Sequence, residues 1–184
     1  MAERRYLYTP LTDDVVVSLR AGDRVYLSGT VLTARDAAHK RLVEILEKGE
    51  ELPVDLRGQV IYYCGPTPPP PGKVIGSCGP TTSSRMDIYT PKLLSVGVKG
   101  MIGKGKRSED VKDGLIKYKA LYFGALGGAG ASISKCVLKA RVLAFEDLGP
   151  EAIYILEVKD MPLFVINDTY GGDLYVEGTS KYRI

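Results

Sequence analysis

Segments with the spacing of a β-strand alternate with segments of helical spacing along most of this 184-residue chain. Strands are expected at residues 15–17, 25–27, 59–63, 74–77 and 100–103, and helices near residues 33–49, 80–86, 90–97 and 108–117. Such alternation is typical of α/β proteins, in which helices pack against a sheet. Because the length suits one sizeable core, we expect a single compact domain over residues 1–184, with a short flexible N-terminus at about residues 1–9.

Two regions depart from this alternation. Strand-like segments at 140–145, 152–158 and 163–166 follow one another with only turns between them. The proline-rich segment Pro66–Gly72 can neither pair in a sheet nor continue a helix, so an extended connector on the surface is predicted. A PxxP ligand is the alternative, but a connector explains the composition without one.

Composition and charge exclude several classes of protein. The net charge of +3 comes without a basic run, so we expect no nucleic-acid partner, although a local cationic pocket for a small anion is compatible with it. No uncharged segment is longer than residues 120–134, which is shorter than the roughly 20 apolar residues of a membrane span. No apolar run follows the charges near the N-terminus, so we expect no secretory signal and a cytoplasmic location.

The cysteines Cys64, Cys78 and Cys136 are widely spaced and form no CxxC pair, which favours reduced thiols over a disulfide framework. Three cysteines could hold an iron–sulfur cluster, but their spacing matches no cluster motif and a single histidine completes no metal pattern. We therefore predict no metal site in this chain. The scarcity of heat-labile amides, with one Asn and one Gln, indicates a thermophilic source.

Arg35 is the first candidate ligand for an anion. Thr33–Asp36 has the pattern of a capping box, and Arg35 falls on the apolar stripe of the helix that follows. A cation near a helix N-terminus is unfavourable by about 0.3–1 kcal/mol unless an anion compensates it. We therefore expect a negative group there, either an internal carboxylate or a ligand. His39, at the edge of the same stripe, is either a proton-transfer group or substrate contact, or a packed and hydrogen-bonded side chain.

The segment Gly79–Met86 is a second candidate. A glycine–proline corner with Pro80 at the first helical position would leave backbone N–H groups free at the helix start. Hydroxyl residues from Thr81 through Thr82 to Ser84 add donors, and Arg85 adds a planar cation that can bind a carboxylate through two parallel bonds. The pattern favours an anion site over the alternative of an ordinary capped helix.

Two glycine-rich segments complete the set of candidates. In Gly103–Lys106, glycines allow close approach to a ligand and Lys104 supplies a point charge, which alone is a weak signal. Gly124–Gly130 suggests a dinucleotide site, but Ile133 stands where the fingerprint requires its last glycine or alanine. The chain also has no Walker A or GxSxG motif.

Together these segments resemble the β subunit, or C-terminal domain, of class I fumarate hydratases, a family that includes L-tartrate dehydratase. The resemblance covers about residues 10–175 and rests on Ser28–Thr30, Thr33–Lys40, Gly79–Asp87, Gly103–Gly105, Leu148–Ala152, Asp160–Pro162 and Asn167–Asp168. It implies a swivelling β/β/α domain with layered sheets and helices. It also implies reversible hydration of a C4 dicarboxylate, fumarate to L-malate, at a site shared between two subunits.

The resemblance further implies a partner, an α subunit that holds a [4Fe-4S] cluster, in an α2β2 heterotetramer. By position, Arg35, Arg85 and Lys104 match the family's ligands for the substrate carboxylates, and Thr81 matches the residue proposed as base; Thr82 and His39 are further catalytic candidates. Lys106 stands where the family pattern has Asn, which leaves open which lysine reaches the substrate.

A free hydroxyl is a poor base at neutral pH, so Thr81 needs an activating group, which we expect from the partner subunit. Two other classes of function compete with the hydratase. One is a non-catalytic module that binds a dicarboxylate with the same cations. The other is a self-sufficient cluster or nucleotide protein, which the cysteine spacing and the glycine pattern disfavour.

Overall fold

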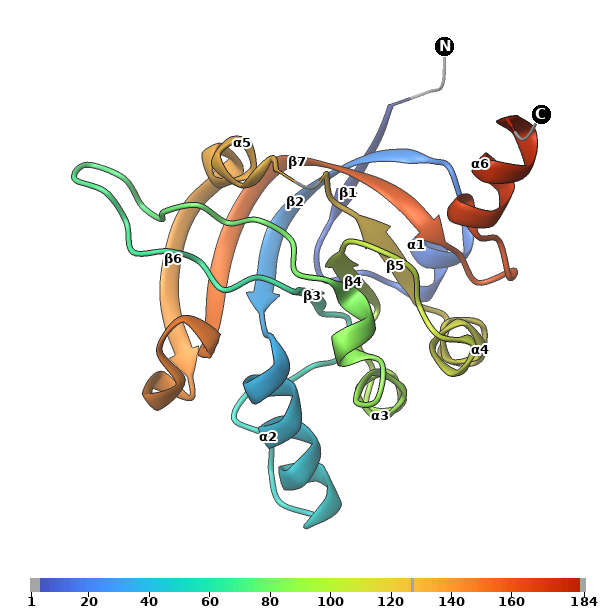
Figure 1. Cartoon of the computed structure of the whole chain (residues 1–184). Helices are drawn as coiled ribbons and strands as arrows, with labels where there is room; N and C mark the ends of the chain where they lie inside the picture. Colours follow the sequence, from blue (N-terminus) through green and yellow to red (C-terminus); the bar gives the residue numbers. More distant parts are fainter. Residues whose placement is uncertain (1–3, 127, 183–184) are drawn as a thin grey trace.

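The computed structural model describes residues 4–126 and 128–182, in which one mixed sheet is covered by helices (Figure 1). The strands are β1 (Arg5–Tyr8), β2 (Arg24–Thr33), β3 (Val60–Tyr62), β4 (Gly100–Gly103), β5 (Leu121–Gly124), β6 (Val137–Ala144) and β7 (Ile153–Asn167). The α-helices are α1 (Asp13–Val17), α2 (Asp36–Glu47), α3 (Thr90–Ser95), α4 (Glu109–Tyr118), α5 (Gly130–Ile133) and α6 (Leu174–Tyr182), and the 3-10 helices are η1 (Ser83–Met86), η2 (Ser134–Cys136) and η3 (Glu146–Glu151).

The sheet closes on itself. The order of the strands in the sheet is β1-β2-β3-β4-β5-β7-β6, and the strands from β1 to β5 are parallel to one another. The long strand β7 runs antiparallel to β5 and also to β2, from Arg24 opposite Phe164 to Leu32 opposite Ile155. Strands β2, β3, β4, β5 and β7 therefore form a ring, to which β1 and β6 are added at the edges of β2 and β7.

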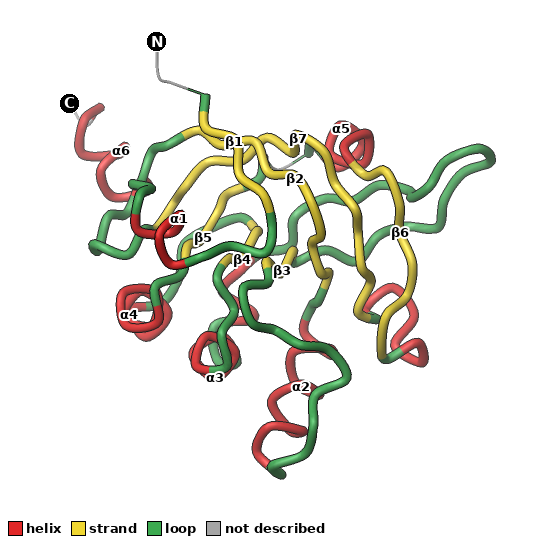
Figure 2. The backbone as a smooth tube through the Cα atoms, turned by 180° about the vertical axis from the view of Figure 1, so that it is seen from behind, coloured by secondary structure: helices red, strands yellow, loops and turns green. Residues whose placement is uncertain are grey.

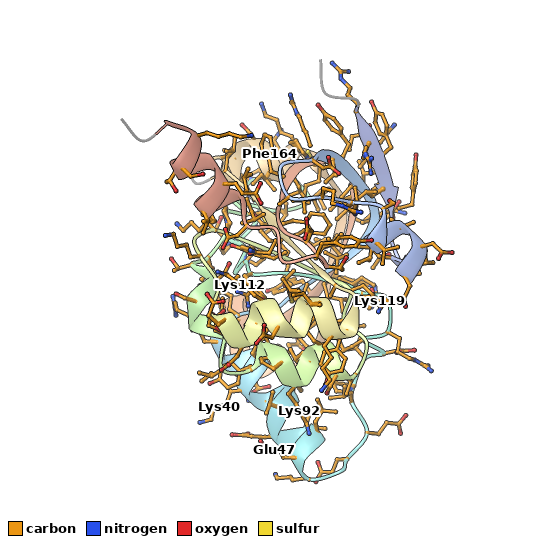
Figure 3. The ribbon with its side chains drawn as sticks, turned by 90° about the vertical axis from the view of Figure 1, so that its right-hand side faces the viewer. Lys40, Glu47, Lys92, Lys112, Lys119 and Phe164 are labelled. Atoms are coloured by element: carbon orange, nitrogen blue, oxygen red, sulfur yellow. The ribbon has the colours of Figure 1, made fainter. Side chains whose placement is uncertain are left out.

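Alternation of side chains along the strands produces two buried clusters. In β3, Val60 and Tyr62 belong to the cluster inside the ring, whereas Ile61 belongs to a second cluster. Leu42 of α2 and Leu115 of α4 cover this second cluster, and each such burial stabilises the fold by about 1.5–3 kcal/mol. Figure 2 shows α2, α3 and α4 on the same side of the sheet, and Figure 3 shows α3 and α4 side by side.

The α/β class and a single compact domain are confirmed. Strands expected at 59–63 and 100–103 appear as β3 and β4, and helices expected at 90–97 and 108–117 appear as α3 and α4. In α4, the Oγ of Ser108 accepts a hydrogen bond from the N–H of Val111 at 3.4 Å, as its capping signal predicts.

The strand prediction at residues 15–17 is wrong, because these residues lie in α1. The Oγ1 of Thr12 caps this helix by accepting from the N–H of Val15 at 3.5 Å, and two aspartates occupy the first turn. Capping and charge at the helix N-terminus therefore outweigh the β-propensity of three successive valines. Residues 74–77, also expected as a strand, have no regular structure.

The two ends of the chain also differ from expectation. Arg5–Tyr8, which fell within the expected flexible N-terminus, forms β1 and pairs with Val25–Ser28; residues 1–3 of that segment lie outside the described residues. The strands expected at 152–158 and 163–166 are one strand, β7. It continues through Asp160, whose φ is 50°, because the N–H of Asp160 donates to Ser28 Oγ at 2.9 Å and ties the bend to β2.

Residues 65–82 form a long connection, here called the proline-rich loop, which has no strand or helix and projects from the body (Figure 1). This agrees with the connector predicted for Pro66–Gly72. The two arms of the loop are tied together at their base, because the N–H of Thr67 donates to the carbonyl of Ser77 at 3.0 Å and the N–H of Ser77 donates to Thr67 Oγ1 at 2.8 Å.

In the described part of the chain, no helix combines the length and the apolar character that crossing a bilayer requires.

Candidate functional site

The parallel strands bring most of the candidate residues to one edge of the sheet. Strands β2, β3, β4 and β5 are parallel, so their carboxyl ends lie at the same edge. Arg35 follows β2, Gly65 follows β3 and Lys104 directly follows β4. The carboxyl edge of parallel strands is where α/β proteins bind their ligands. The fold therefore places candidates that are far apart in the sequence at a position suited to a shared site.

The hydroxyl-rich segment runs across this edge between β3 and β4. The N–H of Thr81 donates to the carbonyl of Tyr63 at 2.6 Å, and Thr82 forms a parallel bridge with Lys104. The N–H of Ser83 donates to the carbonyl of Lys104 at 2.9 Å. Thr81, Thr82 and Lys104 are thus neighbours on adjacent backbone segments.

This pairing corrects the expected helix start. The helix is a single 3-10 turn that begins at Ser83, so Pro80 is not its first residue. The N–H groups of Thr81 and Ser83 are bonded to backbone carbonyls and cannot serve an anion, because strand-like pairing with β3 and β4 has taken their place. The side chains of this segment, unlike these two N–H groups, remain available to a ligand as donors.

Arg35 and Arg85 meet at one carboxylate. The Nε and Nη2 of Arg85 donate to the two oxygens of Asp36 at 2.9 and 2.8 Å, a bidentate pair. The Nη2 of Arg35 lies 3.8 Å from Asp36 Oδ2 and 3.5 Å from Glu151 Oε1. The Nε of Arg35 is buried without a hydrogen-bond partner among the described residues. The guanidinium groups of Arg35 and Arg85 can therefore both contact a single carboxylate.

The predicted compensation of Arg35 at the helix start is confirmed, and the anions are Asp36 and Glu151. Glu151 Oε2 accepts from the N–H of Ala37 at 2.9 Å and so caps α2 from a distant segment. The capping box predicted with Thr33 is wrong: α2 begins at Asp36 after Arg35, whose side chain makes no capping bond. Thr33 belongs to β2, and its Oγ1 accepts from the N–H of Tyr154 at 3.1 Å.

His39 lies behind Arg35 and is buried. Its Nδ1 is 2.8 Å from the carbonyl oxygen of Arg35, which requires a proton on Nδ1, and its ring packs edge-on against Tyr63 at 5.2 Å. Burial lowers the pKa of His39 from 6.5 to about 4, so the imidazole is neutral at pH 7. The side chain is packed and hydrogen-bonded, and its expected role in proton transfer stays a prediction.

Arg107, which the sequence analysis did not single out, supports the segments that carry the candidate residues. Arg107 is buried; its Nε donates to Asp87 Oδ1 at 2.7 Å and its Nη2 donates to Thr90 Oγ1 at 2.8 Å. Its guanidinium also lies over the rings of Tyr63 and Tyr122, at 5.3 and 4.9 Å from the ring centroids. Burial opposes the charge of Arg107, but Asp87 and the two tyrosines raise its pKa. Nothing in the sequence distinguishes Arg107 as a buried residue from the other cations of its loop.

The hydroxyl of Tyr122 connects this support to the ligand-facing segments. It lies 2.8 Å from Ser83 Oγ and donates to the carbonyl of Gly105 at 2.9 Å. The turn that carries Arg85 and the loop that carries Lys104 are therefore fixed to the same buried tyrosine. Lys104 and Lys106 are both exposed, so the structure does not separate them as ligands.

The cysteines do not assemble into a cluster site. Among the described residues, no three His, Cys, Asp or Glu side chains are arranged to hold a metal ion. Cys64 and Cys78 face each other, whereas Cys136 lies in η2. A [4Fe-4S] cluster needs three or four thiolates, which the described part of this chain does not bring together.

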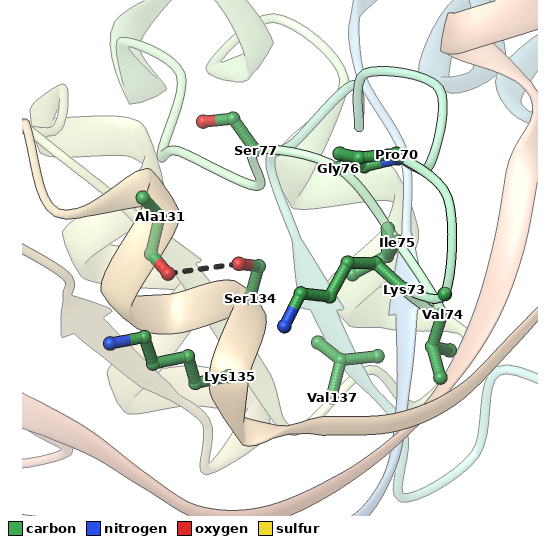
Figure 4. Close-up of a pocket in the computed structure, with 11 residues that line it drawn as sticks. Pro70, Lys73, Val74, Ile75, Gly76, Ser77, Ala131, Ser134, Lys135 and Val137 are labelled. Carbon is green, nitrogen blue, oxygen red and sulfur yellow. Dashed lines mark hydrogen bonds between the residues drawn. The ribbon is translucent and has the colours of Figure 1, made fainter.

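A separate pocket lies under the proline-rich loop (Figure 4). Its volume is about 490 Å³, and its walls come from the loop, α5, η2 and the start of β6. The pocket is lined by none of the predicted site residues, so the candidate site is the sheet edge and not this pocket.

The fold and the site define the class of this protein: an α/β domain whose parallel strands end at arginine, lysine and threonine side chains suited to a carboxylate. A family model described as Fumarase C-terminus matches residues 2–178. This chain belongs to that family.

Curated relatives agree with this assignment. "Fumarate hydratase 2" of Leishmania major is 42% identical over 156 residues, which are 84% of this chain and 28% of the relative. "Fumarate hydratase class I, anaerobic" of Escherichia coli is 39% identical over 160 residues, 86% of this chain and 29% of the relative. "Putative L(+)-tartrate dehydratase subunit beta" of Methanocaldococcus jannaschii is 36% identical over 182 residues, 96% of this chain and 93% of the relative. The chain thus spans under a third of these fumarate hydratases and nearly all of the tartrate dehydratase subunit.

Proposed function

We propose that this chain is the β subunit of a class I fumarate hydratase, which hydrates fumarate reversibly to L-malate and is active only with an α subunit. The observation that carries the proposal is the convergence of Arg35 and Arg85 on the carboxylate of Asp36, at the strand edge that also presents Thr81 and Lys104. The relatives named fumarate hydratase support the choice of reaction.

The charges suit a C4 dicarboxylate. A substrate with two carboxylates needs more than one cation, and the Asp36 contacts demonstrate that two guanidinium groups reach one carboxylate within 2.8 and 3.8 Å. Lys104, directly after β4 at the same edge of the sheet, adds a third cation. We assign these three residues to binding the substrate carboxylates.

The dehydration of malate removes a proton from the carbon next to one carboxylate and a hydroxide from the neighbouring carbon. Negative charge grows on that carboxylate as the proton leaves, and we assign its stabilisation to Arg35, Arg85 and Lys104. We assign the proton transfer to Thr81, with Thr82 beside it as a further hydroxyl and neutral His39 behind Arg35. Thr81 requires an activating group, which we assign to the partner subunit.

The [4Fe-4S] cluster belongs to the proposed α subunit, where its open iron would act as a Lewis acid toward the substrate hydroxyl and a carboxylate. The proposal also includes a swivelling β/β/α domain, an α2β2 assembly, a cytoplasmic location and a thermophilic source. The name of the Methanocaldococcus relative, a subunit beta, supports a protein of more than one subunit.

A second candidate is the β subunit of an L-tartrate dehydratase. It is favoured by the relative from Methanocaldococcus jannaschii, of which this chain covers 93%, against 28% of the Leishmania fumarate hydratase. The two activities differ by one hydroxyl on the substrate, and both use two carboxylates. The same cations therefore suit either substrate.

The test is a reconstitution with a cluster-bearing α subunit under anaerobic conditions. Fumarate formation from L-malate is followed by ultraviolet absorbance for this chain alone, for the α subunit alone and for the mixture, and L-tartrate is tried in parallel. Activity only in the mixture supports the proposal, and the better substrate separates the two candidates. If the chain binds dicarboxylates in a calorimeter but adds nothing to turnover of an active α subunit, it is a binding module.

A further inference from the structure

Cys64 and Cys78 lie face to face at the base of the proline-rich loop. Their Sγ atoms are 3.0 Å apart, and both side chains are 0% exposed. The sulfur–sulfur bond of a disulfide is about 2.05 Å long, so the two thiols need to approach by only about 1 Å. Nothing in the proposed reaction uses these two thiols.

The backbone on both sides holds the two sulfurs opposite each other. Each cysteine begins a Cys-Gly-Pro tripeptide, Cys64–Pro66 on one arm of the loop and Cys78–Pro80 on the other. The N–H of Cys78 donates to the carbonyl of Gly130 at 3.3 Å, and its carbonyl accepts from the hydroxyl of Tyr62 at 2.6 Å. The bonds between Thr67 and Ser77 close the arms just beyond the thiols.

We propose that Cys64 and Cys78 form a reversible disulfide that locks the base of the proline-rich loop, and that a small-molecule disulfide is its oxidant. One cysteine thiolate attacks the oxidant, forms a mixed disulfide and releases one thiolate. The second cysteine then attacks the mixed disulfide, forms the Cys64–Cys78 bond and releases the other thiolate. The two protons lost by the cysteines are taken up by the two released thiolates, so the exchange balances.

Position separates this pair from the third cysteine. Cys136 lies in η2 and is partly exposed, and no group of three potential metal ligands among the described residues offers the pair another use. A hydrogen bond with Cys78, together with burial, raises the pKa of the Cys64 thiol, which makes exchange slow while the loop is closed. A slow exchange calls for long equilibration rather than a brief exposure to oxidant.

The cross-link would lie beside a residue of the candidate site. A Cβ atom on Gly65 would come within 3.1 Å of Arg35 Nη1, so the residue after Cys64 packs against this guanidinium. An effect of the disulfide on dicarboxylate binding rests on the proposed function, whereas formation of the disulfide does not.

The test uses the full chain, equilibrated anaerobically in buffers of reduced and oxidised glutathione, then unfolded in guanidinium chloride and blocked with N-ethylmaleimide so that buried thiols are labelled too. We expect the oxidised protein to carry one maleimide adduct in place of the three that the cysteine count allows. Trypsin should yield residues 58–73 joined through a disulfide to residues 74–85, and the fully reduced buffer should restore all adducts.

Two variants make the result specific. Cys136→Ser should keep the cross-link and lose the remaining adduct, whereas Cys78→Ala should abolish the cross-link in a protein whose circular dichroism matches that of the parent. Three adducts in the most oxidising buffer, or a linkage that contains Cys136 or joins two chains, overturns the proposal. Because the readout is mass and not turnover, failure of the disulfide is distinguishable from failure of the hydratase function.

Discussion

Replacing Asp87 by alanine tests whether the buried ion pair with Arg107 supports the site. The side chain of Arg107 is 0% exposed and that of Asp87 is 10% exposed. Asp87 accepts from Arg107 Nε at 2.7 Å and, with its other oxygen, from the N–H of Ser108 at 2.7 Å. Removing one partner of a buried pair costs about 3–5 kcal/mol, because the other charge stays buried without compensation. We expect Asp87→Ala to lower the free energy of unfolding by that amount.

Arg107 has little with which to replace the lost carboxylate. Its Nη1 is already buried without a hydrogen-bond partner among the described residues. The remaining contacts are Thr90 Oγ1 and the faces of Tyr63 and Tyr122. None of these carries a formal negative charge at pH 7, so the expected cost stays near the magnitude for a broken buried pair.

Urea unfolding at pH 7, followed by circular dichroism, measures this cost. The matched control is Asp55→Ala, since Asp55 pairs with Arg57 at the same 2.7 Å distance but with side chains that are 59% and 81% exposed. Exposed pairs contribute about 0–1 kcal/mol, so the control should lose several-fold less. A loss for Asp87→Ala no larger than that of the control refutes the reasoning.

A double variant tests the coupling directly. Adding Arg107→Met to Asp87→Ala removes the uncompensated charge, so the double variant should be more stable than Asp87→Ala alone. If Arg107→Met instead adds its full single-variant cost, the pair is not coupled and the ion-pair argument fails.

Three further predictions concern the site and its supports. Arg85→Ala should lower turnover of the reconstituted enzyme by at least about 100-fold, with little loss of stability because the side chain is 50% exposed. Arg57→Ala is the control. Unchanged turnover in Arg85→Ala would exclude Arg85 from the site. His39 has a pKa of about 4 in the folded chain, below its ordinary 6.5, so its contribution to the free energy of unfolding is complete above pH 6.5 and falls by about 3 kcal/mol as the pH drops toward 4. His39→Gln should make the free energy of unfolding depend less steeply on pH in this range. An equally steep dependence contradicts the assignment. Thr33→Val should lower the free energy of unfolding, measured in urea, by about 1–3 kcal/mol, because the N–H of Tyr154 loses its acceptor. Thr33→Ser keeps an acceptor and should lower it less. Equal losses in the two variants contradict this role of the Thr33 hydroxyl.

Local signals were sufficient where an element is stabilised by its own residues. Helix α4 begins directly after its cap Ser108, which lies only three residues from the N–H group whose hydrogen bond it accepts. Strand β3 is apolar because both of its faces are buried. The strand prediction for Val15–Val17 failed because the cap of α1 outweighed the β-propensity of the valines. The continuity of β7 through Asp160 depends on a bond to Ser28, in a strand distant in sequence, which no local pattern contains.

The site follows the same rule. The sequence motifs predicted Arg35, Arg85 and Lys104 as ligands of a carboxylate, and the parallel order of the strands brings the segments that carry them to one edge. The cap of α2 by Glu151 and the support by Arg107 and Tyr122 depend on tertiary contacts. Their residue types are ordinary for surface charge or core packing, so composition and spacing cannot single them out.

The charge balance at the site makes a last prediction about Asp36. Three cations, Arg35, Arg85 and Lys104, are offset by Asp36 and Glu151, which leaves one net positive charge for a substrate that carries two negative ones. A substrate carboxylate that binds Arg85 must therefore compete with Asp36 for the same bidentate face. Asp36→Asn weakens this competitor and adds one unit of net positive charge, so the KM of the reconstituted enzyme for L-malate should fall, most clearly at low salt where the charge is least screened. The stability of the variant should stay within about 1 kcal/mol of the parent, as expected for one charge near a helix start. If the KM rises in such a stable variant, Asp36 holds Arg85 in its binding position instead of competing for it.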